Sequence, residues 1–314
     1  MGEANDDPIV ITGATATGKT RLAVALAREI GGEVISMDSR QVYRGMDIGT
    51  AKPDLDERAG VPHHGFDLVN PDERYSAGRF ARDARAWIAA IQARGATPIL
   101  AGGTGFFLRA LTRPMFREPP LETGRRQSLR QMLDRLSTDR LRQWVGTIEN
   151  AGFDGWGGGG RQRLVRRIEV ALLTGRPLSW WQQNAPPAEP PLHPRVFVLG
   201  MDRASLVRRI EGRVLDMVRD GLVDEVRSLL DRGYTAADPG MNATGYIEFV
   251  PHARGSRALD ESIRLTQQAT RRYARRQVTW FGTQLDDTAV RLDASLETGT
   301  LRDLVVRDVK GVAH

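Results

Sequence analysis

The segment from Ile9 to Ala27 constrains the fold of this chain more than any other. It begins with the β-branched run Ile9-Val10-Ile11-Thr12, which predicts a buried strand, and it ends in the apolar spacing of an amphipathic helix. The loop between them has the spacing G-x-x-x-x-G-K-[ST], which is the phosphate-binding loop pattern in the strand–loop–helix context that it requires. The loop residues are Gly13, Ala14, Thr15, Ala16, Thr17, Gly18, Lys19 and Thr20.

The residue types in this loop suit a bound anion. Glycines let the backbone wrap around a phosphate, and consecutive N–H groups at a helix N-terminus supply partial positive charge. Lys19 adds a full charge, and the hydroxyl of Thr20 is a ligand that Mg²⁺ accepts beside phosphate oxygens. We therefore expect a phosphate compound with Mg²⁺. The alternative is a glycine-rich turn that binds nothing.

The composition excludes two classes of protein. The chain has no cysteine, which excludes disulfide-stapled folds and thiolate metal sites and is typical of a reducing compartment. No apolar run reaches the ~18 residues of a membrane-spanning helix, and residues 1–8 are acidic and polar, unlike a signal peptide. We expect a cytoplasmic protein with no membrane partner.

The chain is basic through arginine. Its formal net charge is +6, from 45 basic and 39 acidic residues, and the only lysines are Lys19, Lys52 and Lys310. This excess favours a polyanionic partner, with nucleic acid first, whereas the alternative is a set of solvated helix faces. The arginines gather at 125–142, 161–167, 203–213 and 264–276.

Two proline-rich breaks, at 114–120 and 184–194, divide the chain. The residues between them predict arginine-rich helices, interrupted by a glycine run. Strand and helix patterns of the α/β type lie on both sides of this region. We therefore predict a P-loop NTPase-like parallel sheet core in two parts, residues 1–120 and 191–314, with a helical insert domain at 121–190.

The second part of the core contains the return to the sheet. Residues 195–200 predict a strand, and Asp202 caps a long helix that contains Arg213. Another helix is expected at 259–281. The spacing of four leucines in the tail predicts one final helix. These are Leu292, Leu296, Leu301 and Leu304.

One carboxylate is well placed for chemistry. The second strand ends at Asp38, and ligands of open α/β sheets bind beside the carboxyl ends of the strands. The strand that begins at Thr97 continues into Gly102-Gly103-Thr104-Gly105, where a P-loop ATPase has an acidic residue that supports its metal ion. The missing carboxylate argues against routine ATP hydrolysis and leaves Asp38 as the best-placed acid.

Several separated blocks of the chain together resemble the tRNA dimethylallyltransferases, also called isopentenyltransferases. Besides the phosphate loop, they are ISMDSRQVYRGMDIGTAKP at 35–53, Pro-His-His at 62–64, Gly-Gly-Thr-Gly at 102–105 and TRRYARRQVTWF at 270–281. The blocks at 35–53 and 270–281 are long and specific. The resemblance covers residues 9 to about 282.

The resemblance implies transfer of a dimethylallyl group from dimethylallyl diphosphate to the N6 amine of adenosine 37 in tRNA, with release of diphosphate. The phosphate loop would hold the diphosphate, with Mg²⁺ at Thr20. Asp38 would act as general base, Thr104 would contact the base or the diphosphate, and Arg213 would be a second diphosphate contact. The family pattern assigns tRNA contacts to Asp38, Ser39, Arg40, Gln41, Thr104, Arg126, Gln162, Arg163, Leu164, Val165 and Arg166.

One segment departs from the family pattern. The family usually has a His-Pro-Asn-Asp-like segment just before the region of Gln162, whereas this chain has Gly-Trp-Gly-Gly-Gly-Gly at 155–160. The absence of cysteine also excludes the zinc finger that some eukaryotic members append. By the resemblance, we expect a monomer that binds the anticodon stem-loop of tRNA.

Two other classes are alternatives. A P-loop kinase of a nucleotide or small metabolite would use Asp38 to activate an acceptor hydroxyl. A GTP- or ATP-gated RNA-binding protein would need a pocket for a nucleotide base, and the sequence contains no guanine-reading motif.

Overall fold

The computed structural model describes residues 7–113, 122–149, 160–187 and 189–311. The chain divides into two compact units, one formed by residues 1–112 with 192–314 and the other by residues 113–191. The predicted domain boundary at 120/121 and the glycines at 155–159 lie outside the described residues.

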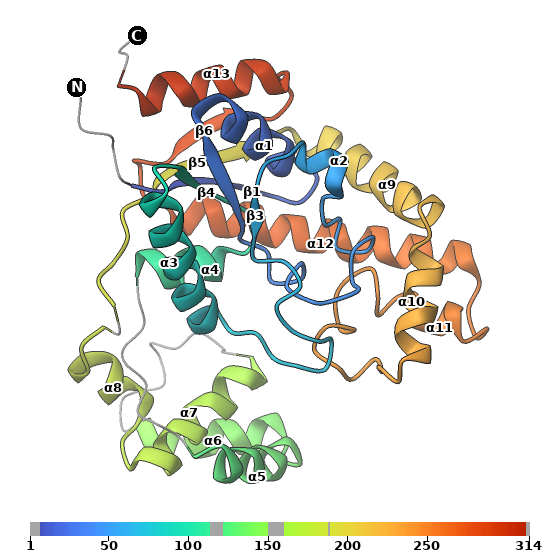
Figure 1. Cartoon of the computed structure of the whole chain (residues 1–314). Coiled ribbons are helices and arrows are strands. Elements are labelled where there is room, and N and C mark those ends of the chain that lie inside the picture. Colours follow the sequence, from blue (N-terminus) through green and yellow to red (C-terminus); the bar gives the residue numbers. More distant parts are fainter. Residues whose placement is uncertain (1–6, 114–121, 150–159, 188, 312–314) are drawn as a thin grey trace. The chain divides into compact units, whose positions relative to one another are not determined.

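A parallel sheet of six strands forms the centre of the larger unit (Figure 1). The strands lie in the order β3-β2-β4-β1-β5-β6, and every pair of neighbours is parallel. The carboxyl ends of the strands therefore meet at one edge of the sheet. This arrangement confirms the predicted α/β class. The strands are β1 (Ile9–Gly13), β2 (Gly32–Ser36), β3 (His63–His64), β4 (Thr97–Ala101), β5 (Arg195–Gly200) and β6 (Val290–Asp293).

Helices cover both faces of this sheet. Because successive side chains of a strand point to opposite faces, β1 contributes to two apolar layers. Ile9 and Ile11 pack with α1 and α13, whereas Val10 packs with α3 and α4, and all three side chains are almost fully buried. The helices of these layers are α1 (Lys19–Ile30), α13 (Thr298–Val309), α3 (Ala77–Ala93) and α4 (Gly105–Thr112).

A further apolar cluster supports the long loop that follows β2. Val42, Tyr43 and Met46 of the loop are buried against Leu222 and Val226 of α10. The loop therefore has its own packing and is not a free excursion from the sheet. The remaining helices of this unit are α2 (Leu55–Arg58), α9 (Arg203–Arg219), α10 (Leu222–Asp231), α11 (Val250–Ala253) and α12 (Leu259–Gln284).

The prediction of one helix through the whole tail was wrong at its start. Leu292 lies in β6, which pairs with β5, and only 8% of Leu292 is exposed. The backbone N–H of Ser295 then donates to Asp293 at 2.9 Å, and α13 begins at Thr298. Residues 290–293 alternate apolar and polar side chains as a strand does, and the leucine spacing across the following turn imitated a helix.

The smaller unit is helical in its described residues. Its apolar core joins three helices through the buried side chains of Leu133, Leu141, Val145, Leu164 and Ile168. The helices are α5 (Thr123–Asp134), α6 (Thr138–Glu149), α7 (Arg161–Thr174) and α8 (Leu178–Asn184).

Candidate functional site

The phosphate loop connects β1 to α1, and local backbone geometry and one side-chain hydrogen bond define its shape. Gly13 has a φ of +139°, and a Cβ there would lie 2.3 Å from the carbonyl oxygen of Leu199 in β5, so only glycine fits. The hydroxyl of Thr17 donates to the carbonyl oxygen of Ala14 at 2.9 Å. The first turn of α1 has no acidic residue and no side-chain cap, which favours an anion at this helix N-terminus.

Lys19 of this loop and Arg213 of α9 are neighbouring cations. Lys19 donates from Nζ to the carbonyl oxygen of Ala14 at 2.6 Å, and a guanidinium nitrogen of Arg213 lies 3.5 Å from the hydroxyl oxygen of Thr15. Burial and the neighbouring Arg213 lower the pKa of Lys19 to about 8, although Asp38 acts in the opposite direction. Burial also lowers the pKa of Arg213. The repulsion between the two cations indicates a site whose ligand carries several negative charges.

Asp38 and Thr104 lie on neighbouring segments, after β2 and β4. Asp38 accepts the backbone N–H of Arg40 at 2.8 Å. The hydroxyl oxygen of Thr104 accepts the backbone N–H of Ser39 at 3.0 Å and lies 3.4 Å from the Ser39 hydroxyl. Burial and the nearby Asp38 raise the pKa of Tyr273. Four predicted site residues therefore lie together: Asp38, Ser39, Arg40 and Thr104.

The glycines after β4 allow the backbone to approach its neighbours closely. A Cβ at Gly102 would lie 2.1 Å from the carbonyl oxygen of Met37, and one at Gly105 would lie 2.4 Å from the indole of Trp280. The side chain that a P-loop ATPase has at this place has no room here. The acid that the sequence lacks here therefore also has no room in the structure.

Gln277 of α12 connects the two loops and was not among the predicted site residues. Its amide nitrogen donates to the carbonyl oxygen of Gly103 at 2.8 Å, and its amide oxygen accepts the backbone N–H of Thr15 at 2.9 Å. The side chain is buried. A buried glutamine that bonds two glycine-rich loops fixes the distance between them. The only signal for it in the sequence was its position within the block 270–281.

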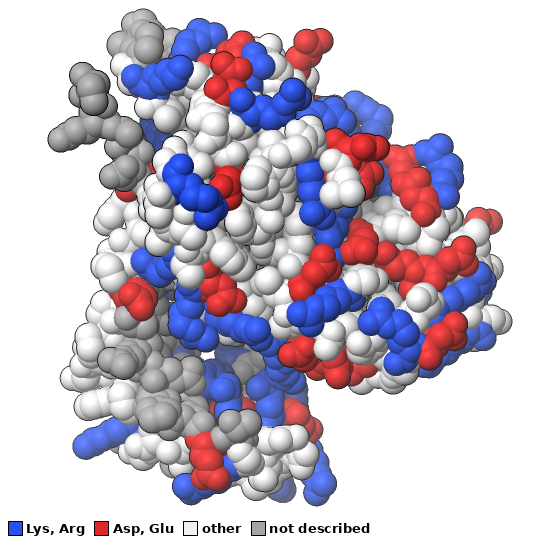
Figure 2. All heavy atoms as spheres, viewed as in Figure 1, with Lys and Arg blue, Asp and Glu red and all other residues white. Residues whose placement is uncertain are grey.

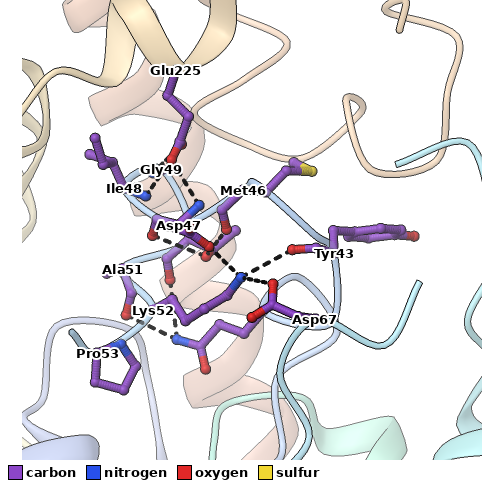
Figure 3. Close-up of polar contacts among 12 residues, drawn as sticks. Tyr43, Met46, Asp47, Ile48, Gly49, Ala51, Lys52, Pro53, Asp67 and Glu225 are labelled. Atoms are coloured by element: carbon purple, nitrogen blue, oxygen red, sulfur yellow. Dashed lines mark hydrogen bonds and ion pairs between the residues drawn. The ribbon is translucent and has the colours of Figure 1, made fainter. Parts of the chain in front are cut away.

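Glu225 of α10 anchors the turn at residues 47–49 (Figure 3). Its carboxylate accepts the backbone N–H groups of Asp47, Ile48 and Gly49 at 2.8, 2.8 and 3.1 Å. It also accepts the hydroxyl of Tyr246, and burial together with this carboxylate raises the pKa of that tyrosine. The turn is therefore fixed to α10 by charge-assisted hydrogen bonds.

Lys52 holds together residues of the long loop that follows β2 (Figure 3). Its side chain is 3% exposed and donates from Nζ to the carbonyl oxygen of Tyr43 at 3.1 Å and to the carboxylate of Asp67 at 2.7 Å. It also pairs with Asp47. A lysine that is committed to three oxygen acceptors supports the loop.

Gln41 is buried and makes hydrogen bonds inside the protein. It accepts the hydroxyl of Ser36 at 2.8 Å, and its amide nitrogen donates to the carbonyl oxygens of Thr50 and Ala51 at 3.3 and 3.0 Å. It is 9% exposed. Both ends of the predicted tRNA-contacting amide are therefore used inside the protein.

These segments enclose a cleft of about 990 Å³. Basic, acidic and apolar side chains all line it, so it accommodates a ligand with an anionic part and an apolar part. The basic lining residues are Lys19, Arg21, Lys52, Arg209 and Arg213. The acidic ones are Asp38, Asp47, Asp54, Glu57, Asp216 and Asp220. The apolar ones include Ala16, Ile48, Ala51, Pro53 and Met217.

The smaller unit contains the other predicted tRNA-binding residues. Gln162 and Arg163 at the start of α7 are exposed, and Arg166 is partly exposed. Leu164 and Val165 are instead buried in the helical core, at 6% and 2% exposure. These two side chains pack in the helical core, because an amphipathic helix turns them inward, and the tRNA contact predicted for this segment stays a prediction.

The fold and the cleft together define a class of protein. A phosphate loop with two cations, a carboxylate in the same cleft and a neighbouring strand that ends in glycines indicate a P-loop protein that transfers a group from a phosphate compound. None of the helices in the described ranges is long and apolar enough to cross a membrane.

Comparison with known proteins specifies this class. A family model described as IPP transferase matches residues 41–284, and one described as Isopentenyl transferase matches residues 8–62. The tRNA dimethylallyltransferase of Geobacter metallireducens is 42% identical over 87% of this chain and 88% of its own length. That of Pelotomaculum thermopropionicum is 36% identical over 97% of this chain and 96% of its own length.

Solved structures agree with this result. The tRNA isopentenylpyrophosphate transferase of Bacillus halodurans has a TM-score of 0.70 at 32% identity, over 98% of both chains. A eukaryotic dimethylallyltransferase acting on tRNA has a TM-score of 0.82 at 26% identity, over 97% of this chain and 79% of that one. The chain belongs to the IPP transferase family.

Proposed function

We propose that this protein transfers a dimethylallyl group from dimethylallyl diphosphate to the N6 amine of adenosine 37 in tRNA and releases diphosphate. One observation carries the proposal. The phosphate loop has two cations for a diphosphate, while the strand beside it ends in glycines that leave no room for a hydrolase's acid. Family membership supports the identity of the transferred group.

The leaving group is stabilised by the loop. As the C1–O bond of the prenyl diphosphate breaks, its electron pair passes to the diphosphate oxygen. The N–H groups of the loop, Lys19 and Arg213 would stabilise this charge where it develops; the contacts of Lys19 and Arg213 with loop atoms support this role. The ammonium and the guanidinium repel one another in the free protein, so binding of the diphosphate relieves this cost, and the charge that builds up on departure strengthens the attraction further.

The acceptor amine approaches from the side of Asp38. Its lone pair forms the bond to C1, and the proton that the amine loses passes to the carboxylate of Asp38. Thr104 is bonded to Ser39, so its hydroxyl is held beside the segment that contains Asp38. We assign the general-base role to Asp38 and the orientation of the base or diphosphate to Thr104.

The residues of the loop fit a magnesium ion bound mainly through the substrate. Among the described residues, no group of three or more His, Cys, Asp or Glu side chains is placed to hold a metal. Mg²⁺ commonly takes one or two protein ligands and completes its shell with phosphate oxygens and water. Thr20 would supply the protein ligand, and the ion would add positive charge against the diphosphate.

The tRNA contacts are proposed for the residues whose side chains are exposed or partly exposed. The adenosine must leave the stack of the anticodon loop to reach the cleft, which costs a few kcal/mol. Contacts to the RNA backbone from Arg163 and Arg166 would offset this cost and make binding salt-dependent. Arg40 and Ser39 lie next to Asp38 and would contact the extruded nucleotide. We also propose that the enzyme is a monomer, because one chain carries every proposed site residue, and that it is cytoplasmic, as expected of an enzyme that acts on tRNA.

Radiolabelled dimethylallyl diphosphate, unmodified tRNA and ATP test the proposal. We expect label to enter tRNA at position 37 in a Mg²⁺-dependent reaction that needs no ATP. ATP-dependent phosphorylation of a small molecule, without prenyl transfer to tRNA, would instead identify a P-loop kinase. Tight binding of a nucleotide by calorimetry, with no binding of the prenyl diphosphate, would identify a nucleotide-gated RNA-binding protein.

A further inference from the structure

Two apolar side chains of the cleft have no role in the leaving-group or base chemistry proposed for its other residues. Ile48, in the turn at residues 47–49, and Met217, near the end of α9, both line the cleft. We call these two side chains the apolar wall. A cleft that combines cations with an apolar surface suits a ligand whose charged part continues into a hydrocarbon part.

The two side chains of the apolar wall lie close to one another at the end of α9. A Cβ at Gly221, four residues after Met217, would lie 3.7 Å from Cδ1 of Ile48. Ile48 and Met217 are both partly buried, and both pack against the apolar cluster that contains Leu222 and Tyr246. One part of each side chain therefore belongs to the core, and another part faces the cleft.

The acidic residues that precede the two side chains in the sequence have basic partners. Asp47 pairs with Lys52, and Asp216 pairs with Arg219. Figure 2 shows acidic and basic side chains interspersed in the same way over the surface of the larger unit around α9 and α10. Because both carboxylates already have a cation, they do not require a positively charged ligand beside the apolar wall.

The turn that contains Ile48 is fixed from behind (Figure 3). The carboxylate of Glu225 accepts all three backbone N–H groups of residues 47–49, at 2.8, 2.8 and 3.1 Å. A Cβ at Gly49 would lie 2.5 Å from the ring of Tyr246, so the turn is packed closely against that ring. Backward movement of the turn would break charge-assisted hydrogen bonds and compress this contact. The position of Ile48 is therefore a fixed boundary of the cleft.

Arg213 relates the apolar wall to the phosphate loop. A guanidinium nitrogen of Arg213 lies 3.5 Å from the hydroxyl oxygen of Thr15. Met217 follows four residues later on α9, so the two side chains share one face of the helix and their Cα atoms are about 6 Å apart along its axis. A dimethylallyl group attached to a diphosphate beside Arg213 is about as long as this spacing. A geranyl group is one isoprene unit longer and exceeds it.

We propose that Ile48 and Met217 bind the hydrocarbon part of the donor and limit it to one isoprene unit. They are then specificity-determining residues for the donor. The inference rests on the proposed function, which supplies a prenyl diphosphate as the ligand. A longer chain would need the space that the two side chains occupy, and the fixed turn at 47–49 does not provide that space by moving.

Ile48→Ala and Met217→Ala open the apolar wall, and Leu215→Ala is the matched control. Leu215 lies on α9 two residues before Met217, but it is 47% exposed and lies outside the lining of the cleft. Its truncation removes a side chain of similar size from the same helix without enlarging the cleft. An effect that comes only from weakening α9 would appear in the control as well.

The assay measures kcat/KM for dimethylallyl diphosphate and for geranyl diphosphate, with an unmodified anticodon stem-loop RNA as acceptor and mass analysis of the product. We expect the wild type to prefer dimethylallyl diphosphate at least 10²-fold. Ile48→Ala and Met217→Ala should each lower this preference about tenfold or more, since one methylene in a tight pocket is worth roughly 10- to 200-fold. Leu215→Ala should keep the wild-type preference.

Three results overturn the inference. They are a wild type that uses both donors equally well, a preference that neither wall variant lowers, and a preference that Leu215→Ala lowers as much as they do. A rise in the KM for the RNA alone would show that the wall contacts the acceptor nucleoside, which also overturns it. If thermal unfolding shows that Ile48→Ala does not fold, Met217→Ala decides. Failure of the proposed function differs, because the wild type would then transfer neither prenyl group to RNA.

Discussion

The pKa of Lys19 should change when a diphosphate binds in the cleft, and this change tests the proposed site. Burial of the ammonium, and secondly the neighbouring Arg213, lower the pKa of Lys19 from 10.5 to about 8 in the free protein. A bound diphosphate supplies the negative charge that both groups lack. We expect it to return the pKa of Lys19 to its ordinary range.

The free-energy cost of keeping Lys19 charged follows from the shift in its pKa. A fall from 10.5 to about 8 corresponds to roughly 3 kcal/mol of unfavourable interaction with the charged form. Below about pH 8 the folded and the unfolded chain both carry this proton, so the folded protein bears the whole cost. Between about 8 and 10.5 the folded chain releases the proton first, and its stability relative to Lys19→Met rises with pH.

The same linkage sets the pH dependence of binding. A diphosphate that keeps Lys19 protonated must take up a proton above about pH 8, so its affinity falls by roughly thirtyfold between about pH 7 and 9.5. The diphosphate of the prenyl donor is already ionised in this range, because the last pKa of a phosphate ester is about 6. Lys19→Met should bind weakly and without this pH dependence.

NMR of protein labelled with carbon-13 at lysine Cε measures the protonation directly. The chain has three lysines, so three side-chain signals are expected, and Lys19→Met assigns one of them. We expect this signal to titrate near pH 8 in the free protein and well above it with dimethylallyl diphosphate bound. An NMR midpoint near 10.5 in the free protein would refute the argument from burial and Arg213.

Three substitutions test other parts of the cleft. Asp38→Asn should lower kcat by about 10²- to 10⁴-fold with little change in the Kd for the stem-loop, and an unchanged kcat removes it from the role of base. Glu225→Gln weakens charge-assisted bonds worth about 1.5–3 kcal/mol each. It should raise the KM for dimethylallyl diphosphate several-fold, whereas a change in the KM for tRNA alone would contradict the anchoring of the turn. Gly103→Ala places a Cβ 2.2 Å from the amide nitrogen of Gln277 and should cost about 1–3 kcal/mol of unfolding free energy and at least tenfold in kcat/KM. Thermal unfolding and steady-state kinetics check this. Wild-type values for both would show that Gln277 and α12 move aside at no cost.

The features predicted from the sequence depend on short stretches of chain. The phosphate loop is fixed within eight residues whose types each have a chemical reason, and its strand–loop–helix context is local. Asp38 follows from its place after a strand in a parallel sheet. The fold class follows from the same strands, because parallel neighbours need crossovers.

The features that were missed depend on contacts between distant residues. Gln277 bonds Thr15 across 262 residues, and Glu225 bonds Asp47 across 178. Neither side chain differs in pattern from its helical neighbours, so no local signal marks it. The burial of Leu164 and Val165 was not foreseen for a related reason. Family position indicates a segment, and only the packing of α7 decides which of its side chains face outward.

The close packing after β4 also limits how the chemistry of this fold could be changed. An aspartate at Gly102 would have its Cβ 2.1 Å from a main-chain oxygen, so it could enter only if β2 and β4 separated. An engineer who wished to convert this transferase into a nucleotide hydrolase by restoring the customary acid would therefore meet an obstacle in the backbone itself. A single side-chain exchange at this position would therefore also require a change in the spacing of two strands.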